Sequence, residues 1–294
     1  MVAWSRVRKF TAIALGTGAG LGAYLYHCLR SDERKVHALW TNSDTAINPY
    51  ALWDSNWDHR SPRHLVKPIV NTSVQEENRY NNDLDRVTPR SVRHIILVRH
   101  AEYLHAGDTD DTHNLTLRGC LQAKYAGRRL RELGVRWDKI IISTMTRAQE
   151  TADIILKEID FDPERLVNCS YIREGAPIPP QPPVGHWRPP KAFFRDGARI
   201  EAAFRRYFHR AFPNEKEDTY TLIVGHGNVI RYFVCRALQF PPEAWLRINI
   251  NHASITWLTI HPSGNVTIEC LGDSGFMPPE YLTSRVPVLP KGVV

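Results

Sequence analysis

Two apolar segments of this 294-residue chain are each followed by a histidine. Residues 95–98 lead to Arg99 and His100, and residues 221–224 lead through a glycine to His226. A neutral imidazole is a competent nucleophile near pH 7, and a guanidinium group can bind two phosphate oxygens at once. These residue types predict phosphoryl transfer to a histidine without help from a metal ion.

A third segment adds another cation. Residues 146–149 read Thr-Arg-Ala-Gln, a capping-box pattern that predicts a helix start with Arg147 in the first turn, where free N–H groups favour an anion. His100 is then the candidate nucleophile, with Arg99, Arg147 and His226 as candidate phosphate ligands. Each residue is weak evidence alone, but these four residues at three strand exits indicate one site.

The elements that must position these residues alternate between strands and helices from residue 92 onward. Strands are predicted at 93–98, 139–143, 220–225, 246–250, 254–260 and 266–271. Helices are predicted at 116–133, from 146, at 198–211, and after His226 with Asn228 as N-cap; the proline-rich residues 177–190 predict a loop. This alternation predicts an α/β fold, a mostly parallel sheet covered by helices on both faces, with ligands bound at the carboxyl ends of its strands.

The N-terminus has a different character. Residues 10–29 carry no charge and contain four glycines, and a helix of about 20 residues just spans a bilayer. The preceding residues are basic and lack acids, which favours a mitochondrial membrane anchor over a cleaved presequence. Residues 31–91 are polar and without sustained periodicity, which predicts a largely extended or disordered linker.

One segment of that linker, the island at residues 53–58, contains two tryptophans. Trp53 and Trp57 lie four residues apart in a polar stretch, and two exposed tryptophans are costly. They are expected to pack either on their own domain or on another chain, and the residues alone do not separate these alternatives.

Composition excludes several classes of protein. The net charge is +7, but four of the basic residues precede the first acidic residue, Asp32. The sequence has no stripe of Lys and Arg residues with interleaved aromatic residues, so it does not predict nucleic-acid binding. The five cysteines are scattered without a CxxC pair, which argues against a disulfide scaffold or a zinc site. We therefore expect no metal and no cofactor.

Four motifs together resemble one family. They are Arg99-His100-Ala101, Leu115-Thr116-x-x-Gly119-x-x-Gln122-Ala123, Ser143-x-x-x-Arg147-Ala148-x-x-Thr151-Ala152 and Val224-Gly225-His226-Gly227. Over about residues 92–275 the chain resembles the histidine phosphatase (phosphoglycerate mutase) superfamily. Nearly the whole chain, its glycine-rich start included, is similar to a mitochondrial, membrane-anchored serine/threonine protein phosphatase branch of that superfamily.

The resemblance implies roles for individual residues. His100 becomes the phosphorylated nucleophile, with Arg99, Arg147 and His226 in the phosphate pocket. Glu174 falls where the family keeps its acid/base carboxylate, and it would need a raised pKa to protonate a serine or threonine leaving oxygen. The alternative for Glu174 is an ion pair with the neighbouring Arg173.

The resemblance also implies an organisation and partners. The chain would comprise a membrane anchor (1–30), a linker (31–91), a phosphatase domain (92–280) and a tail (281–294). It would act on phosphoproteins and assemble with itself. The family's multimer-forming motif corresponds to the island at 53–58 (Trp53, Asp54, Asn56, Trp57 and Asp58), with Ser55 where a proline is usual. The resemblance therefore favours an intermolecular contact for this island.

Two other functions remain open at this stage. One is a small-molecule phosphatase or mutase. Ala101 stands where many members of the superfamily have glycine, and the polar residue that mutases use shortly afterwards is not evident, so a phosphatase is favoured. The other is a membrane-tethered scaffold with a vestigial site, which the presence of all four core residues makes the weaker hypothesis.

Overall fold

The computed structural model describes residues 52–71, 73–105, 109–184 and 188–284. The chain divides into two units, Met1–Trp53 and Asp54–Val294, and of the first unit only Leu52 and Trp53 are described, both exposed. The predicted membrane anchor lies outside the described residues. Within them, no helix has the length and apolar character needed to cross a membrane.

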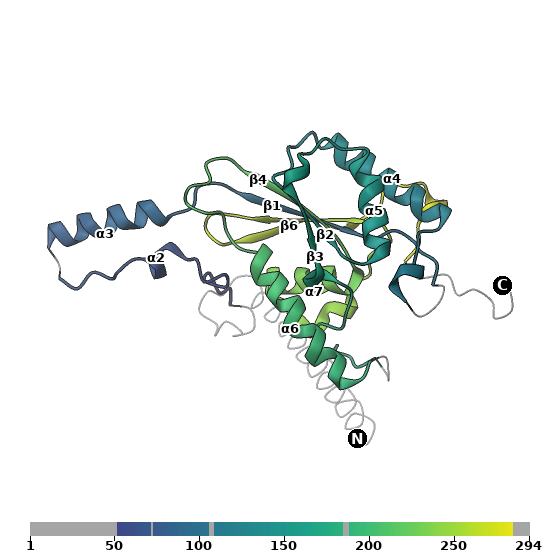
Figure 1. Cartoon of the computed structure of the whole chain (residues 1–294). Coiled ribbons are helices and arrows are strands. Elements are labelled where there is room, and N and C mark those ends of the chain that lie inside the picture. Colours follow the sequence, from purple (N-terminus) through teal and green to yellow (C-terminus); the bar gives the residue numbers. More distant parts are fainter. Residues whose placement is uncertain (1–51, 72, 106–108, 185–187, 285–294) are drawn as a thin grey trace, which may run out of the picture. The chain divides into compact units, whose positions relative to one another are not determined.

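The second unit is built on a six-stranded sheet of order β3-β2-β4-β1-β5-β6 (Figure 1). The strands are β1 (Arg93–Arg99), β2 (Lys139–Ser143), β3 (Leu166–Cys169), β4 (Thr219–Gly225), β5 (Ile255–Ile260) and β6 (Val266–Asp273). The first four strands in this order pair in parallel. β5 pairs antiparallel with β1 and with β6, so the sheet is mixed. The predicted strand 246–250 was wrong, because a 3₁₀ helix (η5, Pro242–Arg247) starts at a proline and occupies its first half.

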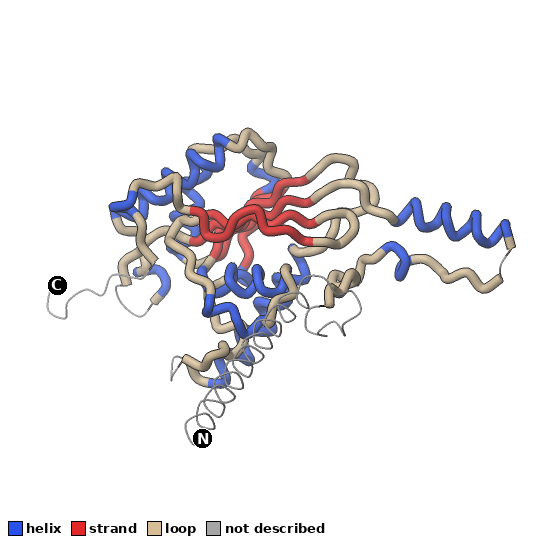
Figure 2. Tube along the Cα trace, turned by 180° about the vertical axis from the view of Figure 1, so that it is seen from behind, coloured by secondary structure: helices blue, strands red, loops and turns tan. Residues whose placement is uncertain are grey.

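Helices cover both faces of the sheet, as predicted (Figures 1 and 2). α4 (Leu117–Glu132) and α5 (Thr146–Leu156) lie on one face, and α6 (Pro190–Tyr207) and α7 (Gly227–Ala237) on the other. Successive strand residues point to opposite faces. Ile96 and Val98 of β1 therefore join the core under α4 and α5, and Ile95 and Leu97 join the core under α6 and α7.

Helix boundaries differ from the predictions where local contacts override the sequence signal. α5 begins at Thr146, but Met145 is its N-cap and there is no capping box, because the Asp110 carboxylate takes the N–H of Thr146. α6 begins eight residues earlier than predicted, at Pro190, since proline suits the first turn of a helix. α7 has His226, not Asn228, as N-cap.

The prediction that residues 31–91 are largely extended was wrong for two segments. α2 (Pro62–Leu65) is a single turn, and α3 (Val74–Val87) is a 14-residue helix without buried residues. Ser73 caps α3 by accepting the N–H of Glu76, and ion pairs along its surface join Arg79 to Glu76 and Asp83. Such local interactions stabilise a helix that has no apolar stripe. Hydrophobic periodicity detects only an apolar stripe, and it therefore missed α3.

The island at 53–58 contacts its own chain. Asp58 forms a buried ion pair with Arg210, whose Nη2 lies 2.9 Å from Oδ1, and the Trp57 indole N–H donates to the Gly264 carbonyl at 2.8 Å. The ring of Trp57 also lies 5.9 Å from that of Phe204 in α6. Asp54 shares two hydrogen bonds with Gln239. Packing on its own domain, the first of the two alternatives, is thus observed for Trp57 and Asp58, and the intermolecular contact stays a prediction.

The Asp58–Arg210 pair gives a stability prediction, since the two side chains are 0% and 2% exposed. Burial opposes the charge of Asp58, but hydrogen bonds and the charge of Arg210 hold its pKa below the ordinary value. Asp58→Asn leaves a buried guanidinium without its counter-ion and is expected to lower the free energy of unfolding by about 3 kcal/mol. Because the folded pKa is depressed, the wild-type contribution is present above about pH 4 and is lost as the pH falls.

Equilibrium urea unfolding of the full chain at pH 7 and pH 3.5 measures both effects. The control is Asp85→Asn, which breaks the exposed pair with Arg90 and should change the free energy of unfolding by less than about 0.5 kcal/mol. Equal stability of Asp58→Asn and Asp85→Asn would contradict the analysis.

Candidate active site

Adjacent strand ends bring two of the predicted residues together. β1 and β4 run parallel with Arg99 opposite Gly225, so the residue after each strand, His100 and His226, meet at the same edge of the sheet. The two imidazole centroids are 5.2 Å apart. Glu174 joins them from the loop that follows β3, and one side-chain ligand atom from each of the three residues lies within 4.8 Å of the others. The site sits at the carboxyl ends of the parallel strands, as expected.

The His100 ring is held in the form that a nucleophile needs. Its Nδ1 lies 2.9 Å from the carbonyl oxygen of Ala101, which can only accept, so the proton resides on Nδ1 and the lone pair on Nε2. The residue is 2% exposed. Burial, followed by the charges of Arg147 and Arg99, lowers its pKa well below the ordinary value. His100 is therefore neutral at pH 7.

Around this ring, buried polar atoms lack partners among the described residues. They include Nε of Arg99, Nε of Arg147 and Nδ1 of His226. Leaving donors unpaired in a buried place costs free energy, so their concentration at one site indicates that a ligand supplies the acceptors. Burial lowers the pKa of Arg99 to about 10, and the group still carries its charge at neutral pH.

Arg147 binds an acidic side chain at the start of α5. Its Nη1 lies 3.3 Å from Oδ1 of Asp110, and Oδ2 of Asp110 accepts the backbone N–H of Thr146 at 3.1 Å. The guanidinium carbon also lies 4.7 Å from the ring centroid of Tyr103. A carboxylate thus occupies a helix N-terminus beside a cation, which is the kind of place that favours phosphate.

Ser143 orients the His226 ring. Its hydroxyl lies 2.7 Å from Nε2 of His226 and also accepts the backbone N–H of Met145 at 3.4 Å. The hydroxyl proton is thus available to Nε2, which leaves the proton of the neutral ring on Nδ1, the unpartnered atom. Burial, followed by the charges of Arg147 and Arg99, lowers the pKa of His226 well below its ordinary value. His226 is placed to donate one neutral hydrogen bond to an anion.

Glu174 is a half-buried carboxyl group whose burial raises its pKa. The charges of Arg147 and Arg99 and the N–H of Gly175, 3.1 Å from Oε1, oppose this rise in pKa. Among the described residues, no ion pair joins Glu174 to Arg173, which was the alternative for this side chain. A neutral carboxyl beside the nucleophile can supply a proton to a leaving oxygen.

The sequence analysis missed several residues of the site. His252, just before β5, is fully buried with its ring 5.5 Å from that of His100, and the ring of Tyr103 lies 5.3 Å from the same imidazole. Asp110 contacts Arg147 from the first residue of a short 3₁₀ helix, η2 (Asp110–Thr112). These residues stand in segments with no recognisable motif, and only the three-dimensional arrangement brings them to the site.

His100, Glu174 and His226 also have the residue types of a three-ligand metal centre. The unpartnered groups around them include guanidinium N–H groups, which donate hydrogen bonds and cannot coordinate a metal ion. The positive charges of Arg99 and Arg147 also disfavour a cation at this place. The arrangement favours an anion.

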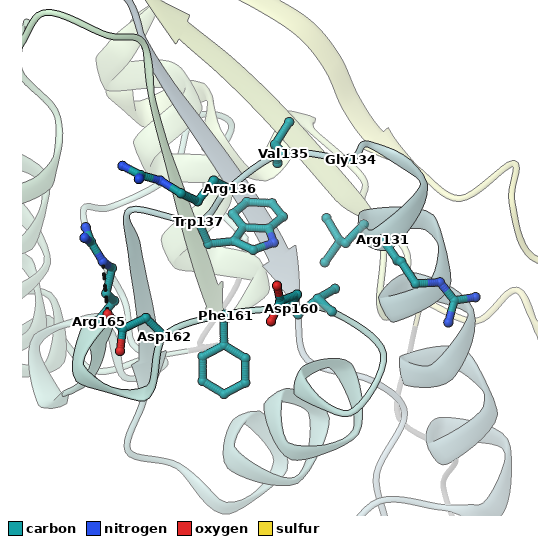
Figure 3. A pocket seen from close by; sticks show the side chains of 11 residues that line it. Arg131, Gly134, Val135, Arg136, Trp137, Asp160, Phe161, Asp162 and Arg165 are labelled. Atoms are coloured by element: carbon teal, nitrogen blue, oxygen red, sulfur yellow. Dashed lines mark ion pairs between the residues drawn. The ribbon is translucent and has the colours of Figure 1, made fainter.

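A cavity of about 660 Å³ lies away from this chemistry, at residues that precede β2 and β3 (Figure 3). Trp137 and Phe161 line it, and three arginines stand at its border. Each arginine has a carboxylate partner: Arg131 pairs with Glu158, Arg136 with Asp138, and Arg165 with Asp138 and Asp162, the last drawn as a dashed line in Figure 3. These paired charges do not form an anion site.

Comparison with known proteins agrees with the geometry. The family model of the histidine phosphatase superfamily (branch 1) matches residues 95–170 and 184–273. The chain is 68% identical over 289 residues to a Drosophila virilis protein named "Serine/threonine-protein phosphatase Pgam5, mitochondrial", covering 98% of this chain and 100% of that protein. A Drosophila willistoni protein of the same name is 66% identical over 291 residues, with the same coverage.

A solved structure is also similar. A phosphoglycerate mutase from Plasmodium falciparum is 33% identical, covers 70% of this chain and 98% of its own, and gives a TM-score of 0.44. On the family model and on relatives of this identity over nearly their whole length, the chain belongs to the histidine phosphatase superfamily.

Proposed function

We propose that this chain is a mitochondrial serine/threonine protein phosphatase that works through a phosphohistidine intermediate. One observation carries the proposal: a buried, neutral His100 with a free Nε2 lone pair faces a group of cationic and neutral donors that have no partners among the described residues. The names of the relatives, which match over nearly their full length, support the substrate class and the compartment.

In the first step, Nε2 of His100 attacks the phosphorus of a phosphoserine or phosphothreonine side chain. The N–P bond forms as the bond to the serine or threonine oxygen breaks, and Glu174 gives its proton to that oxygen. Arg99, Arg147 and His226 hold the three equatorial oxygens, whose charge spreads in the transition state. Arg147 exchanges its contact with Asp110 for the phosphate.

In the second step, water attacks the phosphorus of the phosphohistidine. Glu174, now a carboxylate, takes a proton from the water, and the N–P bond breaks to return the lone pair to Nε2. Inorganic phosphate leaves, and both His100 and Glu174 are restored. The protein side chains carry every proton in this sequence, so the proposed cycle needs no metal ion.

We also propose that the chain is anchored in a mitochondrial membrane by residues 1–30 and assembles with itself through the motif at 53–58. The charge-free run at 10–29 supports the anchor. Trp53, whose side chain is exposed, supports a contact made by this motif beyond the chain's own domain. The first residues of the proposed tail (281–294) contact the phosphatase domain, since Thr283 accepts a hydrogen bond from Gln122 at 2.8 Å.

The nucleophile is tested by His100→Ala. This variant is expected to reduce phosphate release from a phosphothreonine peptide by about 10³-fold or more, since it removes the nitrogen that accepts the phosphoryl group. Wild-type protein quenched in denaturant during turnover should carry an acid-labile phosphate that His100→Ala lacks. His64→Ala, at an exposed histidine of α2, is the control. Activity retained in His100→Ala, or lost from the wild type on treatment with EDTA, would overturn the mechanism.

The acid role is tested by Glu174→Gln on two substrates. The rate on a phosphothreonine peptide should fall by about 10²–10⁴-fold, whereas p-nitrophenyl phosphate, whose leaving group needs no proton, should lose far less in the phosphorylation step. Because burial raises the pKa of Glu174, the wild-type rate on the peptide should decline as the pH rises through that raised value, and this limb should vanish in the variant.

Single-turnover phosphorylation at a series of pH values separates this step from hydrolysis. Glu164→Gln, at an exposed glutamate before β3, is the matched control. Equal losses on the peptide and on p-nitrophenyl phosphate would assign Glu174 a role other than acid.

A further inference from the structure

His252 is a buried histidine in the active site that the proposed mechanism does not use. Its side chain is 0% exposed, and it lies three residues before β5. Both ring nitrogens have partners: Nε2 lies 2.9 Å from Nη2 of Arg99, and Nδ1 lies 2.8 Å from Oγ1 of Thr283. The ring therefore links a residue of the phosphate site to the C-terminal segment.

The hydrogen-bond inventory fixes the direction of these contacts. A guanidinium group has donors only, so Nε2 of His252 accepts from Arg99, and the ring proton resides on Nδ1 and is donated to Thr283. Burial and the charge of Arg99 lower the pKa of His252 to about 2. The ring is thus neutral at neutral pH, as an acceptor must be.

The other contacts of Arg99 show what this acceptor does. Nη1 donates to the carbonyl oxygens of Ile250 at 2.8 Å and Ser284 at 3.0 Å. With one Nη2 proton on His252, two donors of the guanidinium have no partner among the described residues, the second Nη2 proton and the proton on Nε. When His252 accepts the Nη2 proton on the side of Nη1, these two donors lie parallel along the Nε–Nη2 edge of the planar group.

The Nε end of that edge lies close to the residue that follows His226. A side-chain carbon added at Gly227 would lie 3.3 Å from Nε of Arg99, so the edge approaches the first residue of α7, next to His226. Two parallel N–H groups match two phosphate oxygens. The three acceptors on the opposite side of the guanidinium therefore decide which of its edges is offered to the ligand.

We propose that His252 is a positioning residue of this phosphatase: by accepting one Nη2 proton of Arg99, and with its own ring fixed by Thr283, it turns the Nε–Nη2 edge of the guanidinium toward the phosphate. Without this acceptor the guanidinium is held only through Nη1, and Nη2 loses the contact that fixes its place in the two-bond geometry. The inference rests on the proposed function for the reaction, but the affinity for inorganic phosphate tests the role of His252 without any turnover.

Three variants of the full chain, purified in detergent, test the proposal. His252→Leu removes the acceptor, and His252→Gln restores one, because the glutamine side-chain oxygen can reach the place of Nε2. His209→Leu is the matched control: His209 is also buried, and its Nδ1 lies 3.1 Å from Nη1 of Arg93 at the far end of β1. Titration calorimetry with inorganic phosphate gives Kd, and a phosphothreonine peptide gives kcat and KM.

His252→Leu is expected to raise the Kd for phosphate about tenfold, the effect of one lost hydrogen bond to a charged group, and to raise KM for the peptide. His252→Gln should return the Kd to within about threefold of wild type. His209→Leu should lower the thermal midpoint but leave the Kd unchanged, which separates positioning from general destabilisation.

An unchanged Kd in a folded His252→Leu protein would overturn the proposal, and so would a failure of His252→Gln to improve on it. If His252→Leu does not fold, Thr283→Val decides the question, because it frees the ring and should raise the Kd in the same direction by a smaller factor. Wild-type protein that binds phosphate but releases none from the peptide would refute the proposed function, while the Kd series would still decide the role of His252.

Discussion

The site depends on one constraint: positive charge and N–H donors are buried at the edge of a sheet with too few acceptors among the described residues. Burial disfavours the charged forms of Arg99, His100 and His226, and together with the charges of Arg147 and Arg99 it lowers the pKa values of the two histidines and keeps them neutral. Arg99 stays charged because its pKa falls only to about 10 and three acceptors hold it. The free energy of the empty site is raised by its unpaired donors, and an anion with several oxygens relieves that cost.

Sheet order converts distant sequence segments into this site. β4 inserts between β1 and β2, so the ends of three parallel strands deliver His100, His226 and Ser143 side by side. The hydroxyl of Ser143 then sets the proton of His226, and the backbone carbonyl of Ala101 sets that of His100. Two imidazoles with similar burial thereby acquire different tasks: one presents a lone pair, and the other presents a proton.

The sequence predicted β1, β2 and β4, because buried strands with short apolar runs leave little ambiguity in period or position. It did not predict β3, the strand that precedes Glu174. It predicted His100, Arg99, Arg147 and His226 from residue type at strand and helix ends, and the geometry brings the two histidines together with Glu174. It failed where long-range contacts override local signals: Asp110 replaces the predicted cap of α5, and Ser73 with surface ion pairs builds α3 without an apolar face. His252 could not be found, since its position follows only from the packing of β5 against β1.

The first and the last residues of the described catalytic unit each contact a buried arginine, and the two arginines lie at opposite ends of the parallel strands. At the edge where the parallel strands begin, Asp58 forms an ion pair with Arg210 and neutralises its charge. At the edge where they end, Ser284 and Thr283 meet Arg99 and His252 with neutral acceptors only. Neutral acceptors orient a guanidinium without cancelling its charge, whereas a carboxylate would compete with phosphate for it. The choice of partner thus separates an arginine that holds the fold from one that remains available to a ligand.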